Sequence, residues 1–319
     1  MVQQKVKYTD TERTPAERAR ALLEEMTLDE KMAQLGCIFP FGDSYDDMEQ
    51  QALEMPYGIG QVSTLEMRRI RTLEEAAGWQ RKMQETVMRQ SPHHIPAIFH
   101  MEGLCGAFIQ EGTSFPSGIA RGSGWDPELE EKIAKVVAKQ EAACGITHIL
   151  APVLDISRDS RMGRQGETYG EDPALAAALG AAYTKGIQTT EAGGRRPESV
   201  AKHFLGFHNS QGGIHGTNSD TPSRLMEEIY GKPFQSAISE SELKGVMPCY
   251  NSIDGEPASV SHRLLTELLR EKMGFDGLCV SDYGGINNAH EVQRIGETIG
   301  ETGLLAMEAG MDIEMPKAT

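Results

Sequence analysis

The sequence predicts an α/β fold, a TIM-like (β/α)8 barrel with room for irregular or missing first elements. From about residue 58, short apolar runs alternate with amphipathic stretches of helical length. Such alternation is typical of a parallel sheet with helical crossovers. Polar residues also follow directly after several different apolar runs. A barrel collects its functional groups from the carboxyl ends of many strands, whereas an open doubly wound sheet gathers them at one switch point.

The first part of the chain reads as two helices. Residues 1–26 form a helical extension, and residues 27–319 form the barrel. Thr27 and Glu30 stand three positions apart ahead of a helical stretch, which is a capping-box pattern.

The remaining elements follow in alternation. The predicted strands are residues 59–65, 96–99, 147–154, 199–204, 246–250, 278–280 and 311–315. The predicted helices are residues 73–89, 127–144, 174–188, 224–239, 262–273 and 302–309. The clearest helix begins with Asp126 as N-cap and Pro127 in its first turn, and Gly145 follows its end.

Known motifs of the open-sheet alternatives do not occur in this sequence. No G-x-G-x-x-G follows a predicted strand, and neither a P-loop nor a G-x-S-x-G elbow is present. The barrel is therefore favoured over the doubly wound sheet.

The amino-acid composition limits the classes of function that this protein can have. Of 319 residues, 39% are hydrophobic and 24% charged, as in a soluble globular protein. The formal net charge of −16 argues against a nucleic-acid partner, and we interpret it as a solubility feature. No stretch approaches the roughly 20 apolar residues of a membrane helix, and the polar first 18 residues lack the core of a signal peptide. A cytoplasmic protein without membrane contact is expected.

No cofactor and no metal are expected. The five cysteines are widely spaced without a C-x-x-C, which indicates reduced, mostly buried thiols. His203, His208 and His215 lie close together in the chain, but their spacing matches no metal motif. Nothing near Cys105 clearly activates its thiol.

Several polar residues stand where predicted strands end. Asp282 follows an apolar strand and is either aimed into the barrel mouth or caps the next helix; position alone does not decide. Lys202 and His203 are adjacent, so both can face one site only if the strand bends there. Tyr250 ends another strand and reads equally well as a core tyrosine.

Two polar loops complete the candidate site. Residues 155–173 carry three arginines among several carboxylates, which form either an ion-pair network or a contact with substrate hydroxyls. Asp172 before Pro173 is an ordinary helix cap. Residues 208–222 are polar and glycine-rich, and we interpret them as part of the site rim.

These segments occur in a characteristic order. They are residues 95–106, 113–116 with 125–126, 158–173, 202–204, 247–251 with 254–255, and 280–283. In this order they resemble glycoside hydrolase family 3, a family of β-glucosidases, β-xylosidases and N-acetylglucosaminidases. The resemblance covers about residues 27–316. It implies a retaining, exo-acting β-glycoside hydrolase that acts on a β-linked glucoside or xyloside through a covalent glycosyl-aspartate intermediate.

The resemblance also implies roles for single residues. Asp282 matches the nucleophilic aspartate. Lys202 and His203 match the adjacent pair that hydrogen-bonds sugar hydroxyls, and Glu102 matches the acidic residue of the nonreducing-end sugar subsite.

Further positions match less central elements of the family. Arg164 matches the arginine of the R-x-G-R loop, and Arg158 is a second candidate. Tyr250 matches the tyrosine near the nucleophile. Tyr283 stands where many relatives carry a tryptophan against the bound sugar.

Three features depart from the family pattern. Cys105 replaces a histidine, and residues 208–220 lack the Asp-Ser-His pair of the N-acetylglucosaminidase branch. The α/β sandwich domain that supplies an acid/base glutamate in two-domain relatives is absent from the sequence. Glu167 and Asp220 are the in-chain candidates for that role.

Alternatives therefore stay open. The chain is either a truncated protein, one half of an enzyme that a second polypeptide completes, or a degenerate single-domain protein. A homodimer is a further open alternative. A non-catalytic sugar-binding barrel is the main alternative function. An aldolase with Lys202 in a Schiff base would leave Glu102, Arg164 and His203 unexplained.

Overall fold

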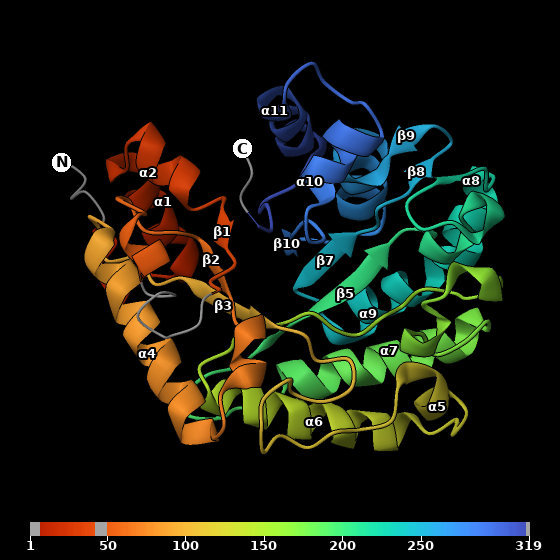
Figure 1. Ribbon diagram of the computed structural model, residues 1–319, viewed down its shortest axis with the longest axis horizontal. Coiled ribbons are helices and arrows are strands. Elements are labelled where there is room, and N and C mark those ends of the chain that lie inside the picture. The colour runs from red at the N-terminus through yellow and green to blue at the C-terminus, as the bar shows by residue number, and fades with distance from the viewer. Residues whose placement is uncertain (1–6, 42–49, 317–319) are drawn as a thin grey trace.

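Seven parallel strands form one continuous sheet at the centre of the protein, in the order β1-β2-β3-β4-β5-β7-β10 (Figure 1). We describe it from a computed structural model that covers residues 7–41 and 50–316. The strands are β1 (Cys37–Ile38), β2 (Gln61–Ser63), β3 (Ile98–Met101), β4 (His148–Ile149), β5 (Glu198–Phe204), β7 (Gly245–Pro248) and β10 (Leu278–Cys279). Every pairing within this sheet is parallel.

The segment around Ile313 and Glu314 closes the sheet into a barrel. Val280, just after β10, forms a parallel bridge with Ile313, and Gly36, just before β1, forms one with Glu314. The Glu314 N–H also donates to the Leu35 carbonyl oxygen at 2.9 Å. This segment thus takes the eighth strand position between β10 and β1. The strand predicted at residues 311–315 is located there, and the TIM-like barrel is confirmed.

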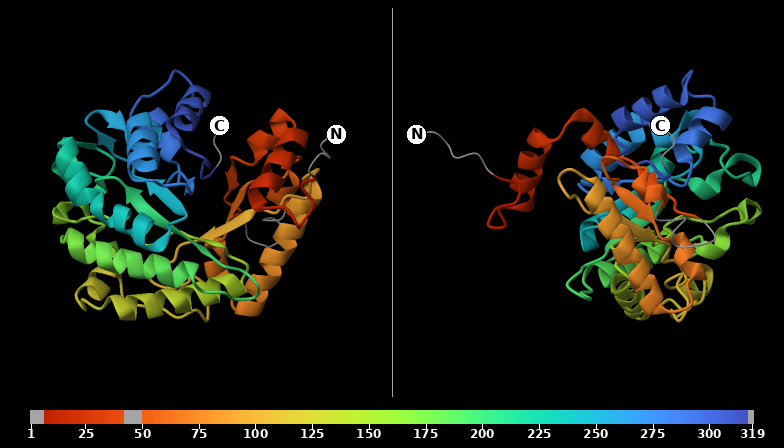
Figure 2. Two further views of the ribbon diagram at one scale, coloured as in Figure 1. Left: turned by 180° about the vertical axis from the view of Figure 1, so that it is seen from behind. Right: turned by 60° about the vertical axis from the view of Figure 1, so that its left-hand side comes forward.

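Helices follow the strands and cover the outside of the barrel (Figure 2). They are α4 (Leu73–Gln90), α6 (Pro127–Ala143), α7 (Pro173–Gln188), α9 (Lys232–Ser241), the π-helical η8 (Arg263–Lys272) and α11 (Ile299–Ala309). Before the barrel lie α1 (Pro15–Glu25) and α2 (Leu28–Ala33), and α1 stands apart from the main body in the right-hand view of Figure 2.

Local capping sets where several helices begin. The Thr27 side chain accepts from the Glu30 backbone N–H, and the Glu30 side chain accepts in return from the Thr27 N–H, so the predicted capping box is confirmed. Asp126 caps α6 and Asp172 caps α7 through their side chains, also as predicted. These contacts are local in sequence, which is why sequence patterns locate them well.

Other boundaries differ from the prediction. β1 was not predicted, because its two residues are too short a run to show a period. The helix expected at residues 224–239 is divided into α8 (Ser223–Leu225), a π-helical turn η6 (Met226–Tyr230) and α9. Within the long polar loop, β6 (Asn218–Ser219) pairs with β8 (Ser252–Ile253), which in turn pairs with β9 (Glu256–Pro257).

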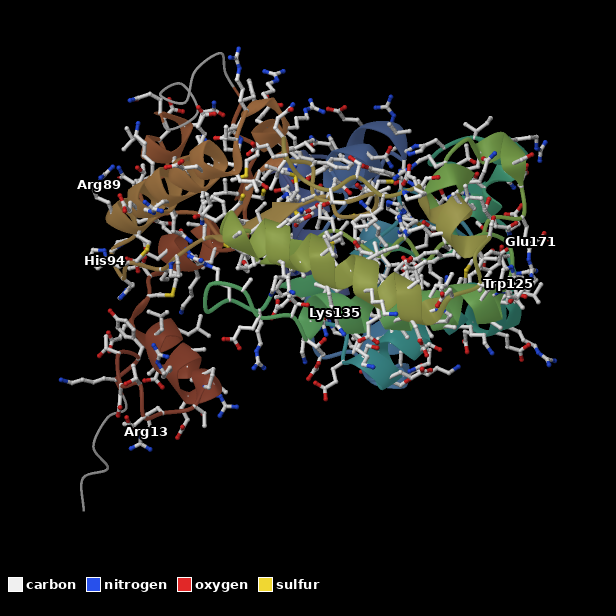
Figure 3. All side chains as sticks on the ribbon, turned by 90° about the horizontal axis from the view of Figure 1, so that it is seen from below. Arg13, Arg89, His94, Trp125, Lys135 and Glu171 are labelled. Carbon is white, nitrogen blue, oxygen red and sulfur yellow. The ribbon has the colours of Figure 1, made fainter. Side chains whose placement is uncertain are left out.

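The loops that follow the strands gather at one end of the molecule. Figure 3 shows Trp125 and Glu171, which precede α6 and α7, at one end. At the other end lie Arg89, in the last turn of α4, and His94, which follows that helix. Lys135 lies between them, on α6. The carboxyl ends of the strands thus open toward the loops before the helices, the end at which barrel enzymes carry their sites.

The barrel interior is partly apolar and partly polar. One buried apolar cluster is formed by Cys37, Leu150, Val200, Met247, Val280, Ile313 and Met315. Gln61, His100 and His148 are also fully buried and come from β2, β3 and β4. All five cysteines are free, and Cys105 alone among them is not buried. Among the described residues, no helix is both long and apolar enough to cross a bilayer.

Candidate active site

The polar residues that follow the strands meet at the carboxyl end of the barrel. Glu102 follows β3, Asp155 lies beyond β4, Lys202 and His203 belong to β5, and Asp282 lies beyond β10. Lys202 Nζ donates to Glu102 Oε2 at 2.5 Å, and His203 Nδ1 lies 2.7 Å from Asp155 Oδ2. His203 Nε2 lies 3.6 Å from Asp282 Oδ2. Lys202 and His203 of β5 therefore connect side chains that follow β3, β4 and β10.

An irregularity in β5 lets Lys202 and His203 contribute to the same cluster. Lys202 pairs with Met247 and Phe204 pairs with Pro248, so His203 is an extra residue relative to β7. Such a bulge changes the alternation of side chains along a strand. Lys202 and His203 can face one site only if β5 bends between them, and this bulge provides the bend. Both side chains are buried beside the strand ends.

Asp282 presents one bonded and one unbonded carboxylate oxygen. The Tyr283 backbone N–H donates to Oδ1 at 2.7 Å, and Oδ2 has no hydrogen-bond partner among the described residues. Asp282 is 7% exposed. Burial raises the pKa of this carboxyl above its ordinary value, against the opposing effects of Lys202 and Tyr250. The residue does not serve as a helix cap, and its free oxygen can accept a new bond.

The protonation of His203 follows from its neighbours. Arg164 Nη2 lies 3.1 Å from Nε2, and a guanidinium group can only donate. Nε2 therefore accepts, and the ring proton is on Nδ1, which donates to Asp155. Burial, together with the positive charges of Arg164 and Lys202, lowers the pKa of His203 well below its ordinary value. His203 is neutral, so its approach to Asp282 is not an ion pair.

Asp155 is a site residue that the sequence argument did not assign. It is 3% exposed, and it accepts from both the backbone N–H and the ring of His203. Burial raises its pKa to about 8, although Arg164 and the His203 backbone N–H act in the opposite direction. Its place just beyond a predicted strand was the available signal. Its partner, almost fifty positions away, could not be read from sequence.

Arg164 is held between Glu167 and an aromatic ring. Its Nε and Nη2 atoms donate to the two Glu167 carboxylate oxygens, each at 2.8 Å. The guanidinium lies 5.1 Å from the centre of the Phe207 ring. Burial raises the pKa of Glu167, but Arg164 outweighs it, and the pKa stays below its ordinary value. Glu167 is thus an ionised partner of Arg164.

Tyr250 and Tyr283 connect the last two strand ends. The Tyr250 hydroxyl donates to the Tyr283 carbonyl oxygen at 2.7 Å, and the Tyr283 hydroxyl lies 3.1 Å from His100 Nε2. The Tyr250 ring also lies 4.9 Å from that of His215, measured between centroids. His215 belongs to the loop at residues 208–222, so this loop contacts the site.

Arg158 is not brought into the cluster. Its side chain is exposed, and its Nε atom donates to the Glu171 carbonyl oxygen at 3.5 Å. Cys105 is part-buried, and burial raises the pKa of its thiol, which disfavours the reactive thiolate. No group of three or more His, Cys, Asp or Glu side chains in the described part of the chain is placed to hold a metal ion.

A family comparison decides what this arrangement belongs to. The sequence model described as "Glycosyl hydrolase family 3 N terminal domain" matches residues 27–319. The chain belongs to this family. The family match begins where the predicted extension ends, at the capping box of α2.

Curated relatives of this family 3 chain are identical to it at about a third of the aligned positions. A β-xylosidase of Formosa agariphila is 34% identical over 230 residues, which are 69% of this chain and 32% of the relative. A β-glucosidase of Rhizobium radiobacter is 36% identical over 206 residues, which are 65% of this chain and 23% of the relative. The matched part of this family 3 chain thus spans less than a third of the length of either relative.

Solved structures of two β-glucosidases share the fold of this chain. A β-glucosidase from Erythrobacter marinus matches with a TM-score of 0.90 at 31% identity, over 98% of this chain and 42% of that one. A β-glucosidase from Listeria innocua in complex with glucose matches with a TM-score of 0.84 at 28% identity, over 95% of this chain and 42% of that one. The barrel of this family 3 chain is therefore the common part.

Proposed function

We propose that this chain is the barrel of a retaining, exo-acting β-glycoside hydrolase of the β-glucosidase or β-xylosidase type, in which Asp282 attacks the anomeric carbon. The observation that carries the proposal is the Asp282 carboxylate. One of its oxygens is fixed by the Tyr283 N–H, and the other is free within a cluster of positive and polar groups. The matched relatives are named β-xylosidase and β-glucosidase, which supports both substrate types.

The proposed step is a displacement at the anomeric carbon. Asp282 Oδ2 forms the new bond, and the bond from that carbon to the leaving-group oxygen breaks. Water then attacks the anomeric carbon from the face that the leaving group left, and the bond from that carbon to Asp282 Oδ2 breaks. The aspartate is released, and the β configuration is retained. The nucleophile must be ionised, and the charges of Lys202 and Arg164 oppose the effect of its burial.

Glu102, Lys202, His203 and Arg164 are proposed to hold the sugar hydroxyls. A carboxylate can accept from two hydroxyls, whereas an ammonium or guanidinium group donates to them. The Lys202–Glu102 ion pair orients both groups before substrate arrives, because each limits the rotation of the other. Such preorganisation favours interactions that strengthen in the transition state.

The general acid is proposed to come from a polypeptide segment outside residues 1–319. A general acid needs a raised pKa, but Glu167 is bound at both oxygens by Arg164 and its pKa is lowered. Asp220 is exposed and accepts from Gln211 and Asn218. Neither in-chain candidate therefore has the environment of a proton donor. A segment of the same chain beyond residue 319 or a second chain would satisfy the proposal.

A burst assay tests the nucleophile without requiring the acid. 2,4-Dinitrophenyl β-glucoside and β-xyloside have leaving groups that need little protonation, so we expect a burst of dinitrophenolate and a sugar-sized mass increase on Asp282. Slow turnover accelerated by azide would support the proposed origin of the acid. Asp282→Asn should abolish the adduct. The control Asp276→Asn changes an exposed aspartate of the same segment and should retain it.

The result that would contradict the proposal is equally clear. A full burst in Asp282→Asn would exclude this residue as the nucleophile. Monosaccharide binding to wild-type protein, without any burst or adduct, would favour the sugar-binding barrel instead.

A further inference from the structure

Tyr283 connects the two polar groups that end β7 and β10. Its backbone N–H donates to Asp282 Oδ1 at 2.7 Å, while its carbonyl oxygen accepts from the Tyr250 hydroxyl at 2.7 Å. Any movement of this one peptide would therefore move the hydrogen bond that orients the Asp282 carboxylate. The backbone of Tyr283 needs an anchor if Asp282 is to keep one orientation.

The side chain of Tyr283 supplies such an anchor inside the barrel. Its hydroxyl lies 3.1 Å from His100 Nε2, and His100 has no exposed surface. Its ring packs edge-on against Phe39, with centroids 5.3 Å apart. The side chain thus contacts β3 and the loop after β1, on the side of the barrel opposite β7.

His100 is the first member of a buried chain of hydrogen bonds. His100 Nδ1 lies 2.9 Å from Gln61 Oε1, and Gln61 Nε2 lies 3.3 Å from His148 Nδ1. Burial lowers the pKa of His100 to about 3 and that of His148 to about 4, so both rings are neutral near pH 7.

The direction of this chain follows from the chemistry of its members. An amide oxygen only accepts, so His100 carries its proton on Nδ1 and donates to Gln61. His100 Nε2 is then an acceptor, and Tyr283 must donate to it. Gln61 Nε2 donates to His148 Nδ1. Each acceptor therefore selects the tautomer of the next group, and the hydroxyl of Tyr283 has one defined direction.

We infer that Tyr283 is a positioning residue: its hydroxyl, held by the buried His100–Gln61–His148 chain, fixes the backbone that orients the Asp282 carboxylate. The chain connects β2, β3 and β4 to the end of β10, across the barrel interior. Its kinetic consequences rest on the proposed function, whereas its effect on Asp282 does not. Misplacing a reacting group by about 1 Å can reduce a rate by about 100-fold.

The first measurement is a carbon-13 NMR titration of the Asp282 carboxyl, in full-length protein labelled at aspartate Cγ. The resonance is assigned by its loss in Asp282→Asn. A donated N–H favours the ionised carboxylate, so loosening it should move the titration midpoint to higher pH. We expect that shift in Tyr283→Phe and in His100→Leu. In His100→Gln the midpoint should stay near wild type, because an amide can both accept from Tyr283 and donate to Gln61.

The second measurement is the rate at which 2,4-dinitrophenyl 2-deoxy-2-fluoro-β-glucoside labels Asp282, followed by intact mass. Tyr283→Phe and His100→Leu should each label about 10- to 100-fold more slowly. The double variant should be no slower than the slower single variant, because both changes break the same connection. Tyr230→Phe, which removes the hydroxyl of a buried tyrosine outside this chain of hydrogen bonds, should label at the wild-type rate.

The two measurements separate this inference from the proposed function. An unchanged Asp282 midpoint and wild-type labelling in Tyr283→Phe would overturn the positioning role and leave the nucleophile intact. A shifted midpoint without labelling of any protein, wild type included, would support positioning and contradict glycosylation by this chain. Folding of each variant is checked by circular dichroism. If His100→Leu fails to fold, Tyr283→Phe still tests the inference, because it removes only one hydroxyl.

Discussion

Lys202 and Glu102, 100 positions apart in sequence, form a 2.5 Å ion pair across the mouth of the barrel. The Lys202 side chain is 4% exposed and that of Glu102 is 15% exposed. The pair brings the end of β5 to the segment after β3. It also leaves a buried positive charge near Asp282, where it lowers the pKa of that carboxyl against the effect of burial.

The first prediction concerns pH. Removing the charge in Lys202→Met should raise the pKa of Asp282 further, because burial would then be opposed less strongly. The acidic limb of the Asp282 labelling rate should therefore move to higher pH. Lys185→Met, which removes an exposed lysine on α7, should leave the limb in place. An unmoved limb in Lys202→Met would mean that this charge does not act on the nucleophile.

The second prediction concerns stability at Asp282. Its folded pKa is raised, so the ionised carboxylate destabilises the fold at neutral pH, and this penalty disappears as pH falls through the folded pKa. Asp282→Asn should raise the melting temperature by about 2 °C or more near pH 7. The gain should shrink at pH 4. Thermal unfolding at both pH values checks this, and a loss of stability at pH 7 would contradict it.

The third prediction concerns Arg164. Its bidentate contact with Glu167 and its position over Phe207 require a planar guanidinium, so Arg164→Lys should not replace it. We expect monosaccharide affinity to fall about tenfold or more in Arg164→Lys, measured by calorimetry. Arg161→Ala is the matched control, because it breaks an exposed pair with Asp159 in the same loop. Equal affinity in Arg164→Lys and wild type would argue against sugar contact.

The fourth prediction concerns closure of the barrel. A Cβ on Gly60, just before β2, would lie 1.9 Å from the Gln34 carbonyl oxygen. Gly60→Ala should therefore destabilise the protein strongly, because backbone on both sides must shift. Gly78→Ala adds a Cβ in α4 with nothing within 4 Å and should stabilise by about 0.5–1 kcal/mol. Urea denaturation midpoints compare the two, and equal midpoints would contradict the close approach seen at Gly60.

Much of the fold could be predicted because its signals are local. The alternation of apolar and amphipathic runs located seven of the strand positions, and the Thr27 box and the Asp126 and Asp172 caps located three helix starts. β1 could not be found this way, because two residues carry no period. The π-helical turn before α9 was also missed, since the same residues fit an ordinary helix.

The candidate site was predictable residue by residue but not as a set of interactions. The sequence located Glu102, Lys202, His203 and Asp282 at strand ends and named Arg164 from its loop. It named Arg158 as a second candidate after Arg164, but Arg158 is exposed and contacts the Glu171 carbonyl oxygen instead. It did not assign Asp155, whose importance depends on His203, a residue of the next strand.

By itself, the sequence determined the order of strands and helices, the barrel class and the family. These depend on residue type and spacing along the chain, which a sequence displays directly. Only the tertiary structure decided that Asp282 has one free oxygen, that His203 is neutral, and that Tyr283 donates to His100. The physical reason is that protonation and hydrogen-bond direction depend on burial and on partners from distant strands, which meet only when the barrel closes.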